Sequence, residues 1–406
     1  MKVLNLYITL SLLCSISLLG EDENLDKYIS ENKKEQFNYD YKKNMVESSK
    51  LGHSWVSPLD LSYSYSKSNP YDNKQTKINY GINIDQPIFK SGGIYYAIKY
   101  AEASKIYANY STDIIKRKLV KDAISLLMQI KQTDLKIIKQ NLQIKNSEIN
   151  LAQKKEDYLN GQLDSGYLDN AIIERNTIIQ ALYDIQTNKE RLISKFQAIS
   201  DINYNNAFVP TLKLVTKNEF LNHNIVLNKS QSEIAKNRYY KDIIVAKYLP
   251  SINLTAGYSW QESKNQQFIP GGLSSTIDTN FYNYGFRISF PLDVNTFSDI
   301  ESAKVDYLKS QLIVEDKKRE LKAIFEQVMQ NIENFKKKKQ LSIENRYIYE
   351  KLLEDTRELF NAGYKTEHDV KLLQNSVKIQ ERDVEIFEID KQLELLNLYE
   401  MYKSEV

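Results

Sequence analysis

Residues that interrupt helices are scarce in this sequence, and their positions divide it. The chain of 406 residues contains seven prolines and 12 glycines. No proline lies between 88 and 209 or after 291. Beyond its start, the first of these stretches has glycine only at Gly161 and Gly166, and the second only at Gly363. Because proline and glycine break helices, each stretch is expected to form two long helices joined at a glycine.

Other absences exclude whole classes of protein. Cys14 is the only cysteine, so a chain cleaved beyond it has neither a disulfide nor a reactive thiol. The three histidines, His53, His223 and His368, do not have the spacing of metal ligands. The 55 Lys and Arg nearly cancel the 53 Asp and Glu, which gives no basis for a nucleic-acid partner. We therefore expect no enzyme activity, no cofactor and no metal.

The N-terminus has the pattern of a secretory signal. A basic start at Lys2 precedes a mostly apolar run over 3–19, and Gly20 offers a small residue for cleavage. The acidic run 21–23 favours a cleaved signal peptide over an uncleaved signal anchor. No later apolar run reaches the ~18 residues of a membrane helix.

A strand followed by a long helix occurs twice. The run Ile-Asn-Tyr-Gly-Ile at 78–82 precedes Pro87, and Asn-Tyr-Gly-Phe at 283–286 precedes Pro291. Matching positions lie 204 residues apart (283 minus 79, and 291 minus 87). The two units are therefore expected to be a duplication.

The helical stretches have coiled-coil periodicity. A helix over 94–160 would be roughly 100 Å long at ~1.5 Å per residue. Gly166 and Gly363 are 197 apart, seven fewer than 204, which predicts one extra heptad in the first hairpin. The helices alone are equally compatible with a soluble coiled-coil rod. Apolar residues spaced 4, 3, 4 and 3 are Leu321, Phe325, Val328, Ile332 and Phe335.

Strand-like alternation of apolar and polar residues occurs in four segments, 59–66, 78–85, 252–260 and 282–290. Their lengths approach the ~9–11 residues of a transmembrane strand. An aromatic face opposite a polar face suits a water-filled barrel in lipid; the alternative is a soluble sheet covered on one side. Because open edges are not tolerated in lipid, four strands require partners, and three copies would supply twelve.

The chain resembles the TolC-like outer membrane efflux protein family. The resemblance rests on Gln-Pro-Ile-Phe-Lys-Ser-Gly-Gly at 86–93, on the run at 248–259, and on the Gly-Tyr pairs at 166 and 363. It implies an α+β membrane protein, a homotrimer in which a twelve-stranded β-barrel in outer membrane lipid continues into a twelve-helix α-barrel in the periplasm. It also implies a periplasmic adaptor and an inner-membrane pump as partners.

The resemblance divides the chain into eight parts. Loops at 67–75 and 261–279 would face the exterior. The parts are 1–20 signal peptide, 21–54 first upper helix, 55–89 first strand pair, 90–203 first long hairpin, 204–227 equatorial linker, 228–248 second upper helix, 249–292 second strand pair and 293–406 second long hairpin.

The same resemblance implies functional residues at the turns of the hairpins. Six residues would form the tips that dock the adaptor, and two more would belong to a periplasmic gate. The tips are Ser165, Gly166, Tyr167, Ala362, Gly363 and Tyr364, and the gate residues are Asp369 and Lys365.

The gate departs from the family pattern. A second acid is often found three residues after the position of Asp369, where this chain has Leu372. With the offset of 197, the first-half equivalent of Asp369 is Ile172, although Asp169 lies about one turn earlier. Asp369 is equally compatible with an exposed acid that offsets the dipole at the start of a helix.

Two classes of function follow. The first is a passive duct from periplasm to exterior in a tripartite efflux or type I secretion system. The second is a trimeric structural or adhesive stalk of the outer membrane without an export role, whose helices would lie outside the cell. The sequence leaves the exported substrate, the pump, the adaptor and the ion selectivity of the gate open.

Overall fold

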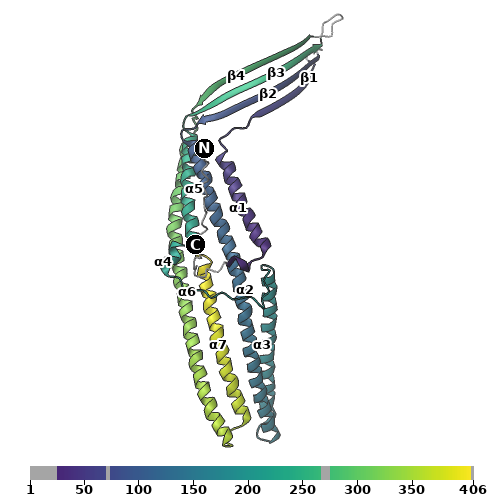
Figure 1. Cartoon of the computed structure of the whole chain (residues 1–406), viewed down its shortest axis with the longest axis vertical. Coiled ribbons are helices and arrows are strands. Elements are labelled where there is room, and N and C mark those ends of the chain that lie inside the picture. Colours follow the sequence, from purple (N-terminus) through teal and green to yellow (C-terminus); the bar gives the residue numbers. More distant parts are fainter. Residues whose placement is uncertain (1–24, 70–73, 267–274, 404–406) are drawn as a thin grey trace, which may run out of the picture.

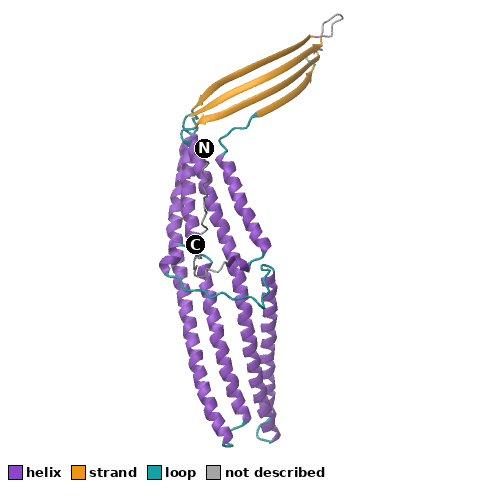
Figure 2. Cartoon of the chain, viewed as in Figure 1, coloured by secondary structure: helices purple, strands orange, loops and turns teal. Residues whose placement is uncertain are grey.

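A small sheet stands at one end of a long bundle of helices (Figures 1 and 2). The computed structural model describes residues 25–69, 74–266 and 275–403. The expected signal peptide at 1–20 lies outside these residues.

The sheet has four antiparallel strands in the order β1-β2-β3-β4: β1 Asp60–Ser68, β2 Lys74–Phe89, β3 Ser251–Gln266 and β4 Ser275–Ser289. The strands outlast the alternating runs, because pairing continues through polar positions such as Lys67 opposite Thr76 and Glu262 opposite Asp278. The expected loops at 67–75 and 261–279 were therefore too long. The bounds of both loops were predicted from the points where apolar residues stop. Backbone hydrogen bonds between strands do not require apolar side chains, so the pairing continues further.

Within the described residues, the helical part consists of a 3-10 turn and seven α-helices. They are η1 Leu25–Tyr28, α1 Glu31–Gly52, α2 Gly93–Leu159, α3 Ser165–Gln197, α4 Lys217–Asn222, α5 Ile225–Lys247, α6 Thr296–Asn361 and α7 Glu367–Tyr399. In the half next to the sheet, the helices lie side by side in the order α1, α2, α5, α6. In the far half the order is α3, α2, α7, α6 (Figure 1).

The two long hairpins differ in length by one residue. α2 and α6 contain 67 and 66 residues, and α3 and α7 contain 33 each. α3 and α7 begin 202 residues apart (367 minus 165). The extra heptad expected in the first hairpin is therefore wrong. Its inference used Gly166 as the counterpart of Gly363, whereas the turn residue that matches Gly363 is Gly161 (363 minus 202).

The main hydrophobic core lies partway along the bundle, where the long helices meet η1 and α4. We call this level the waist. Fully buried side chains from distant parts of the chain gather there, among them Tyr28, Leu127, Phe196, Phe220 and Leu398. The ring of Phe220 on α4 lies 5.7 Å from that of Phe325 on α6. Burial of aromatic and aliphatic side chains from both halves at one level joins the two repeats into one body.

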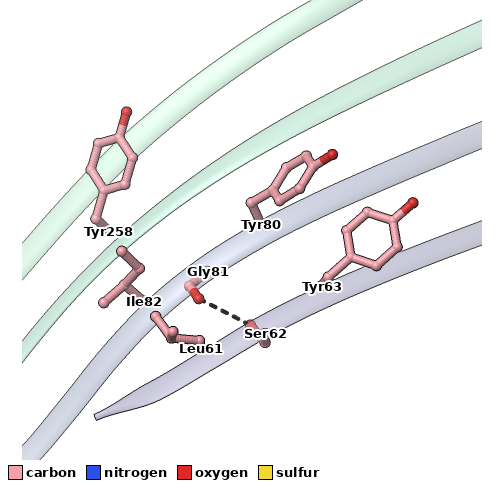
Figure 3. Close-up of a pocket in the computed structure, with 7 residues that line it drawn as sticks. All are labelled: Leu61, Ser62, Tyr63, Tyr80, Gly81, Ile82 and Tyr258. Atoms are coloured by element: carbon pink, nitrogen blue, oxygen red, sulfur yellow. Dashed lines mark hydrogen bonds between the residues drawn. The ribbon is translucent and has the colours of Figure 1, made fainter.

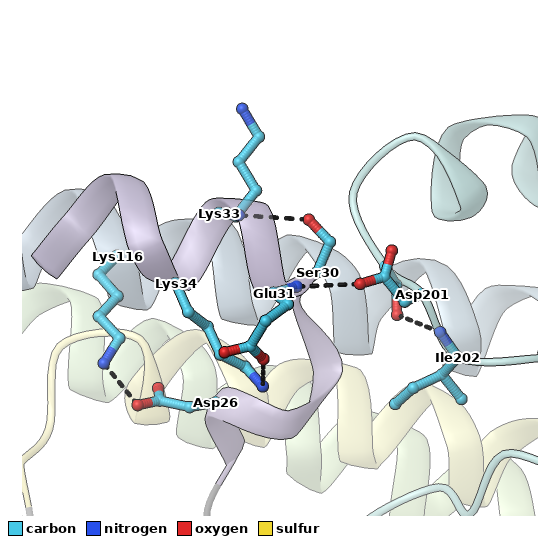
Figure 4. A network of polar contacts seen from close by, with 9 residues as sticks. Asp26, Ser30, Glu31, Lys33, Lys34, Lys116, Asp201 and Ile202 are labelled. Atoms are coloured by element: carbon cyan, nitrogen blue, oxygen red, sulfur yellow. Dashed lines mark hydrogen bonds and ion pairs between the residues drawn. The ribbon is translucent and has the colours of Figure 1, made fainter.

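Polar contacts fix the start of α1 against this core (Figure 4). Ser30 is the N-cap, and its side chain accepts a hydrogen bond from the Lys33 amide. The Glu31 amide donates to the Asp201 carboxylate at 2.9 Å, and Lys116 of α2 pairs with Asp26. The two hydrogen bonds satisfy amides that a helix start leaves unpaired, and the ion pair ties the preceding turn to α2. Together they fix the direction in which α1 leaves the waist.

Candidate functional site

One face of the sheet is aromatic and uncovered. Tyr63, Tyr80 and Trp260 form a row across three strands, with ring centroids 5.1 and 5.3 Å apart. Figure 3 shows Tyr63 and Tyr80 beside Tyr258 on this face. On β4, Tyr284 is 81% exposed. Within the described residues no other element covers this face, so the chain leaves a large apolar surface that requires lipid or another molecule.

The apolar band runs obliquely across the strands. On β1 the run 61–65 lies, through β2, opposite 258–262 of β3, whereas on β4 the run 282–288 lies opposite 252–258. The centre of the band thus moves by about five residues, or ~17 Å, over three strand spacings of ~4.8 Å each. If a plane is placed parallel to this oblique band, the strands are tilted by roughly 45–50° from the normal of that plane.

The opposite face is polar and internally hydrogen-bonded. Arg287 on β4 pairs with Asp85 on β2 at 3.1 Å, and Asn253 on β3 donates to the same carboxylate at 2.7 Å. Gly257 lies beneath two amides: a Cβ there would stand 2.5 Å from Asn283 Oδ1. This face is therefore polar, with its opposite charges paired and its amides hydrogen-bonded.

The molecule has two open sides, each continuous along its length. Among the described residues, β1, α1 and α3 have no neighbour on their outer side at one edge. At the other edge β4 has none, and α6 is contacted at the waist only by the short helix α4 besides its packing on α5 and α7. α6 also carries a second row of exposed apolar residues, about a quarter turn around the helix from its packed row. We call this row the second seam of α6; its far-half members, spaced 7, 4 and 7, are Leu341, Ile348, Leu352 and Leu359.

Charged and amide side chains form a belt across all four helices of the far half. Lys339 of α6 binds Glu388 of α7 at 2.7 Å, Gln132 of α2 binds Asp390 of α7 at 2.6 Å, and Lys189 of α3 binds Asp134 of α2 at 2.7 Å. We call these six residues the polar belt. Glu388 also accepts from Lys391 at 2.9 Å. Burial raises its pKa, but the hydrogen bonds from both lysines outweigh this and lower the pKa to about 2.

The first hairpin turns at Gly161. That residue has φ +72°, and Asp164 caps α3 by accepting from the Gly166 amide at 2.7 Å. Gly166 itself lies in the first turn of α3 without positive φ. The expected role of Gly166 as the turn glycine is therefore wrong. Ser165 and Tyr167 lie beside it, exposed at the end of the hairpin (Figure 1).

The second hairpin turns at Gly363, with φ +84°. Ala362 is the C-cap of α6, and Tyr364 is 79% exposed at the tip. The predicted turn at Gly363 is confirmed. Glycine suits this position because it adopts the left-handed conformation without strain.

Asp369 forms a capping box with Thr366. Its Oδ2 accepts from the Thr366 amide at 3.0 Å, and the Thr366 hydroxyl accepts from the Asp369 amide at 3.3 Å. The backbone hydrogen bond from Thr366 lowers the pKa of Asp369. Lys365 precedes the N-cap and so lies outside α7. It makes no ion pair with a described residue, but its positive charge contributes to the lowered pKa of Asp369.

The nearly equal hairpins also correct the expected equivalence of Asp369. Subtracting 202 gives Tyr167, not Ile172. The two tips therefore present a tyrosine and a capping aspartate at the same place. The T-x-x-D signature of the second cap was visible in the sequence and would have located the helix start.

The described part of the chain has neither a metal-binding cluster nor a membrane-spanning helix. No group of three or more His, Cys, Asp or Glu side chains there has a metal-binding arrangement. None of the helices in that part combines the length and apolar character needed to cross a membrane.

The fold is that of known outer membrane channels. The chain is similar to the outer membrane protein VceC of Vibrio cholerae (TM-score 0.71, 14% identity, 93% of this chain and 95% of that one). It is also similar to the CmeC outer membrane channel of Campylobacter jejuni (TM-score 0.70, 11% identity, 94% and 86%) and to the open MtrE channel of Neisseria gonorrhoeae (0.63, 12%, 93% and 86%).

The second half of the sequence matches a family model. Residues 217–401 match the outer membrane efflux protein family. No curated protein matches the sequence. The family match and the fold together confirm the resemblance to TolC-like outer membrane efflux proteins, a family of channel proteins of the outer membrane rather than of enzymes.

Proposed function

We propose that the protein is the outer membrane component of a tripartite efflux or type I secretion system, a passive duct from the periplasm to the exterior. The observation that carries this proposal is the sheet: an uncovered aromatic face, a polar opposite face and two unpaired edge strands, β1 and β4. This combination suits a share of a water-filled barrel in lipid.

Two features of the apolar band support a lipid boundary. It is rich in tyrosine, with Trp260 at its edge, and such residues favour membrane interfaces. Its oblique course gives a strand tilt of roughly 45–50°, near the ~35–45° of transmembrane barrel strands. A soluble partner covering the sheet would not require the band to cross the strands at this angle.

A ring of three copies closes the chain at all levels. β4 of one copy would pair with β1 of the next, and α6 would pack against α1 above the waist and α3 below it. The same two sides are open in the sheet and in both halves of the bundle. Three copies give twelve strands and twelve helices at each level, and the Asp85–Arg287 face would line the barrel.

The remaining assignments depend on this ring. Residues 1–20 would direct export and be removed, the sheet would lie in the outer membrane, and the long hairpins would extend into the periplasm. The exposed tips, with Tyr167 and Tyr364, would meet the adaptor and pump. Asp369 from three copies would converge at the entrance together with Lys365 and attract cations.

Adjacent residues on opposite faces of β4 test the membrane assignment. Tyr284→Lys would place a charge in lipid, at a cost of ~2–4 kcal/mol near the midplane, and should abolish insertion. Asn283→Lys, its matched control, faces the water-filled side and should leave an inserted, conducting channel. Equal insertion of both variants would contradict the barrel.

Export and gating need separate measurements. Tyr167→Asp with Tyr364→Asp should abolish export while leaving trimers in native mass spectrometry and channels in planar bilayers.

Loss of divalent-cation block in Asp369→Asn, with block retained in Glu358→Gln, would support the gate. An intact trimer that inserts but exports nothing with any pump would favour the structural stalk.

A further inference from the structure

We propose that the copies are locked in register below the waist by two ion pairs between neighbours, Lys337 of α6 with Glu190 of α3, and Glu333 of α6 with Arg191 of α3. This inference rests on the proposed trimer and names the surface through which it closes.

The charges involved lack partners across helices in the single chain. Within the described residues, Glu190, Arg191 and Lys337 make no ion pair, and Glu333 has only a 3.9 Å contact with Lys336 on its own helix. By contrast, the polar belt joins charged or amide side chains at all three helix contacts within the chain. The belt is thus interrupted only where one copy would meet the next.

These charges lie at the same height. Glu190 is 25 residues after the start of α3 at Ser165, and Lys337 is 24 residues before the end of α6 at Asn361. α3 and α6 run antiparallel in the bundle, so a neighbouring α3 would bring these residues level. One residue further up α3, Arg191 then approaches Glu333, one turn further up α6. Both contacts join opposite charges.

The surrounding surface fits the same register. Lys337 continues the second seam of α6, four residues before Leu341. On α3, the side turned away from α2 exposes Ile173 and Tyr183. In the proposed register Ile173 lies about two residues from the level of Leu352, and Tyr183 lies between Leu341 and Ile348. Apolar contacts would supply affinity, whereas complementary charges would fix which residues meet.

A shift by one heptad would break this match. Moving α3 by seven residues would bring Glu190 to the level of Glu344 in one direction and of Gln330 in the other. The first alternative opposes like charges and the second leaves Lys337 without a partner. The polar middle of the seam therefore discriminates between registers that the apolar residues alone would tolerate.

Engineered disulfides test the register in the full-length chain, because Cys14 is its only cysteine. Glu190→Cys with Lys337→Cys should oxidise to covalent trimers on non-reducing gels, since a disulfide requires Cα atoms within ~7 Å. Glu190→Cys with Glu344→Cys, offset by a heptad, should remain monomeric on the gel. Cross-linking of the offset pair instead of the matched pair would overturn the proposed register.

Charge reversal provides a second readout. At low salt, Glu190→Lys should raise the dissociation constant of the trimer at least tenfold. Adding Lys337→Glu should restore the native value. Failure of the double variant to recover would contradict the ion pair. If the native chain is monomeric in native mass spectrometry, the trimer itself fails; a stable native trimer without the matched cross-link refutes only this contact.

Discussion

α2 and α6 are equivalent helices of the two repeats, with nearly the same length, yet their surroundings differ. α2 lies inside the chain, with α3 and α7 beside its far half and α1 and α5 beside the near half. α6 packs against α5 and α7 and contacts the short α4 at the waist, and it also carries the exposed second seam. A duplicated sequence has thus produced one interior helix and one edge helix, and the edge helix retains apolar residues that its own chain does not cover.

The largest effect should come from breaking the interior helix. Leu127 on α2 is fully buried at the waist. Leu127→Ala should lower the free energy of unfolding by ~2–5 kcal/mol, because it removes apolar contacts and leaves a cavity. Guanidinium denaturation followed by circular dichroism measures this change.

Leu341→Ala is the matched variant on the edge helix. Leu341 is 59% exposed in the single chain, so the same substitution should leave the unfolding of a dissociated chain nearly unchanged and weaken only the trimer. Equal destabilisation of dissociated chains by both variants would show that the second seam is already covered within one copy.

The two turns offer a smaller contrast. Gly363 has φ +84°, so Gly363→Ala should cost ~1–2 kcal/mol by placing a Cβ in the left-handed region. Gly166 has helical geometry, and Gly166→Ala should change stability little, since the higher helix propensity of alanine offsets the 3.0 Å approach to Asp164. Thermal unfolding separates the two. A larger loss in Gly166→Ala would restore Gly166 as the turn glycine.

The same contrast explains what sequence reasoning could predict. Strict alternation located all four strands, and the absence of proline located both hairpins, because each pattern reflects the period of one element. The alternation could not place the strand ends, where polar residues continue the backbone pairing. Sequence reasoning misaligned the tips because Gly161 and Gly166 are five residues apart and composition does not reveal which has positive φ.

The functional residues were harder to predict for a different reason. The resemblance supplied Asp369 as a gate residue, whereas the T-x-x-D spacing indicates a capping box in which Thr366 binds its carboxylate. The second seam of α6 was readable as a heptad at 341–359, yet a heptad does not state whether its partner is in the same chain. That distinction required the positions of α7 and α3.

The capping box gives a prediction of about 1 kcal/mol. Thr366→Ala removes the hydroxyl that accepts from the Asp369 amide and should cost ~1 kcal/mol. Thr366→Ser keeps that oxygen and should remain close to the native chain in urea denaturation. The equivalent cap in the first repeat, Asp164, should show a similar loss on substitution by alanine. Unequal losses would show that the two hairpin turns differ in more than sequence.

The smallest effect concerns the polar belt and pH. The pKa of Glu388 is lowered to about 2 from a usual value of 4.5. A depressed pKa in the folded state means that its contribution is fully present above about pH 4.5 and is lost as pH falls toward 2. The pair is partly exposed, so this contribution should be below ~1 kcal/mol. Glu388→Gln should therefore flatten the decline in unfolding free energy between pH 4.5 and 2. Glu354→Gln, on an exposed acid without an ion pair among the described residues, should leave that decline unchanged. If both variants decline in parallel with the native chain, the lysine contacts of Glu388 do not contribute to the acid sensitivity of the hairpin.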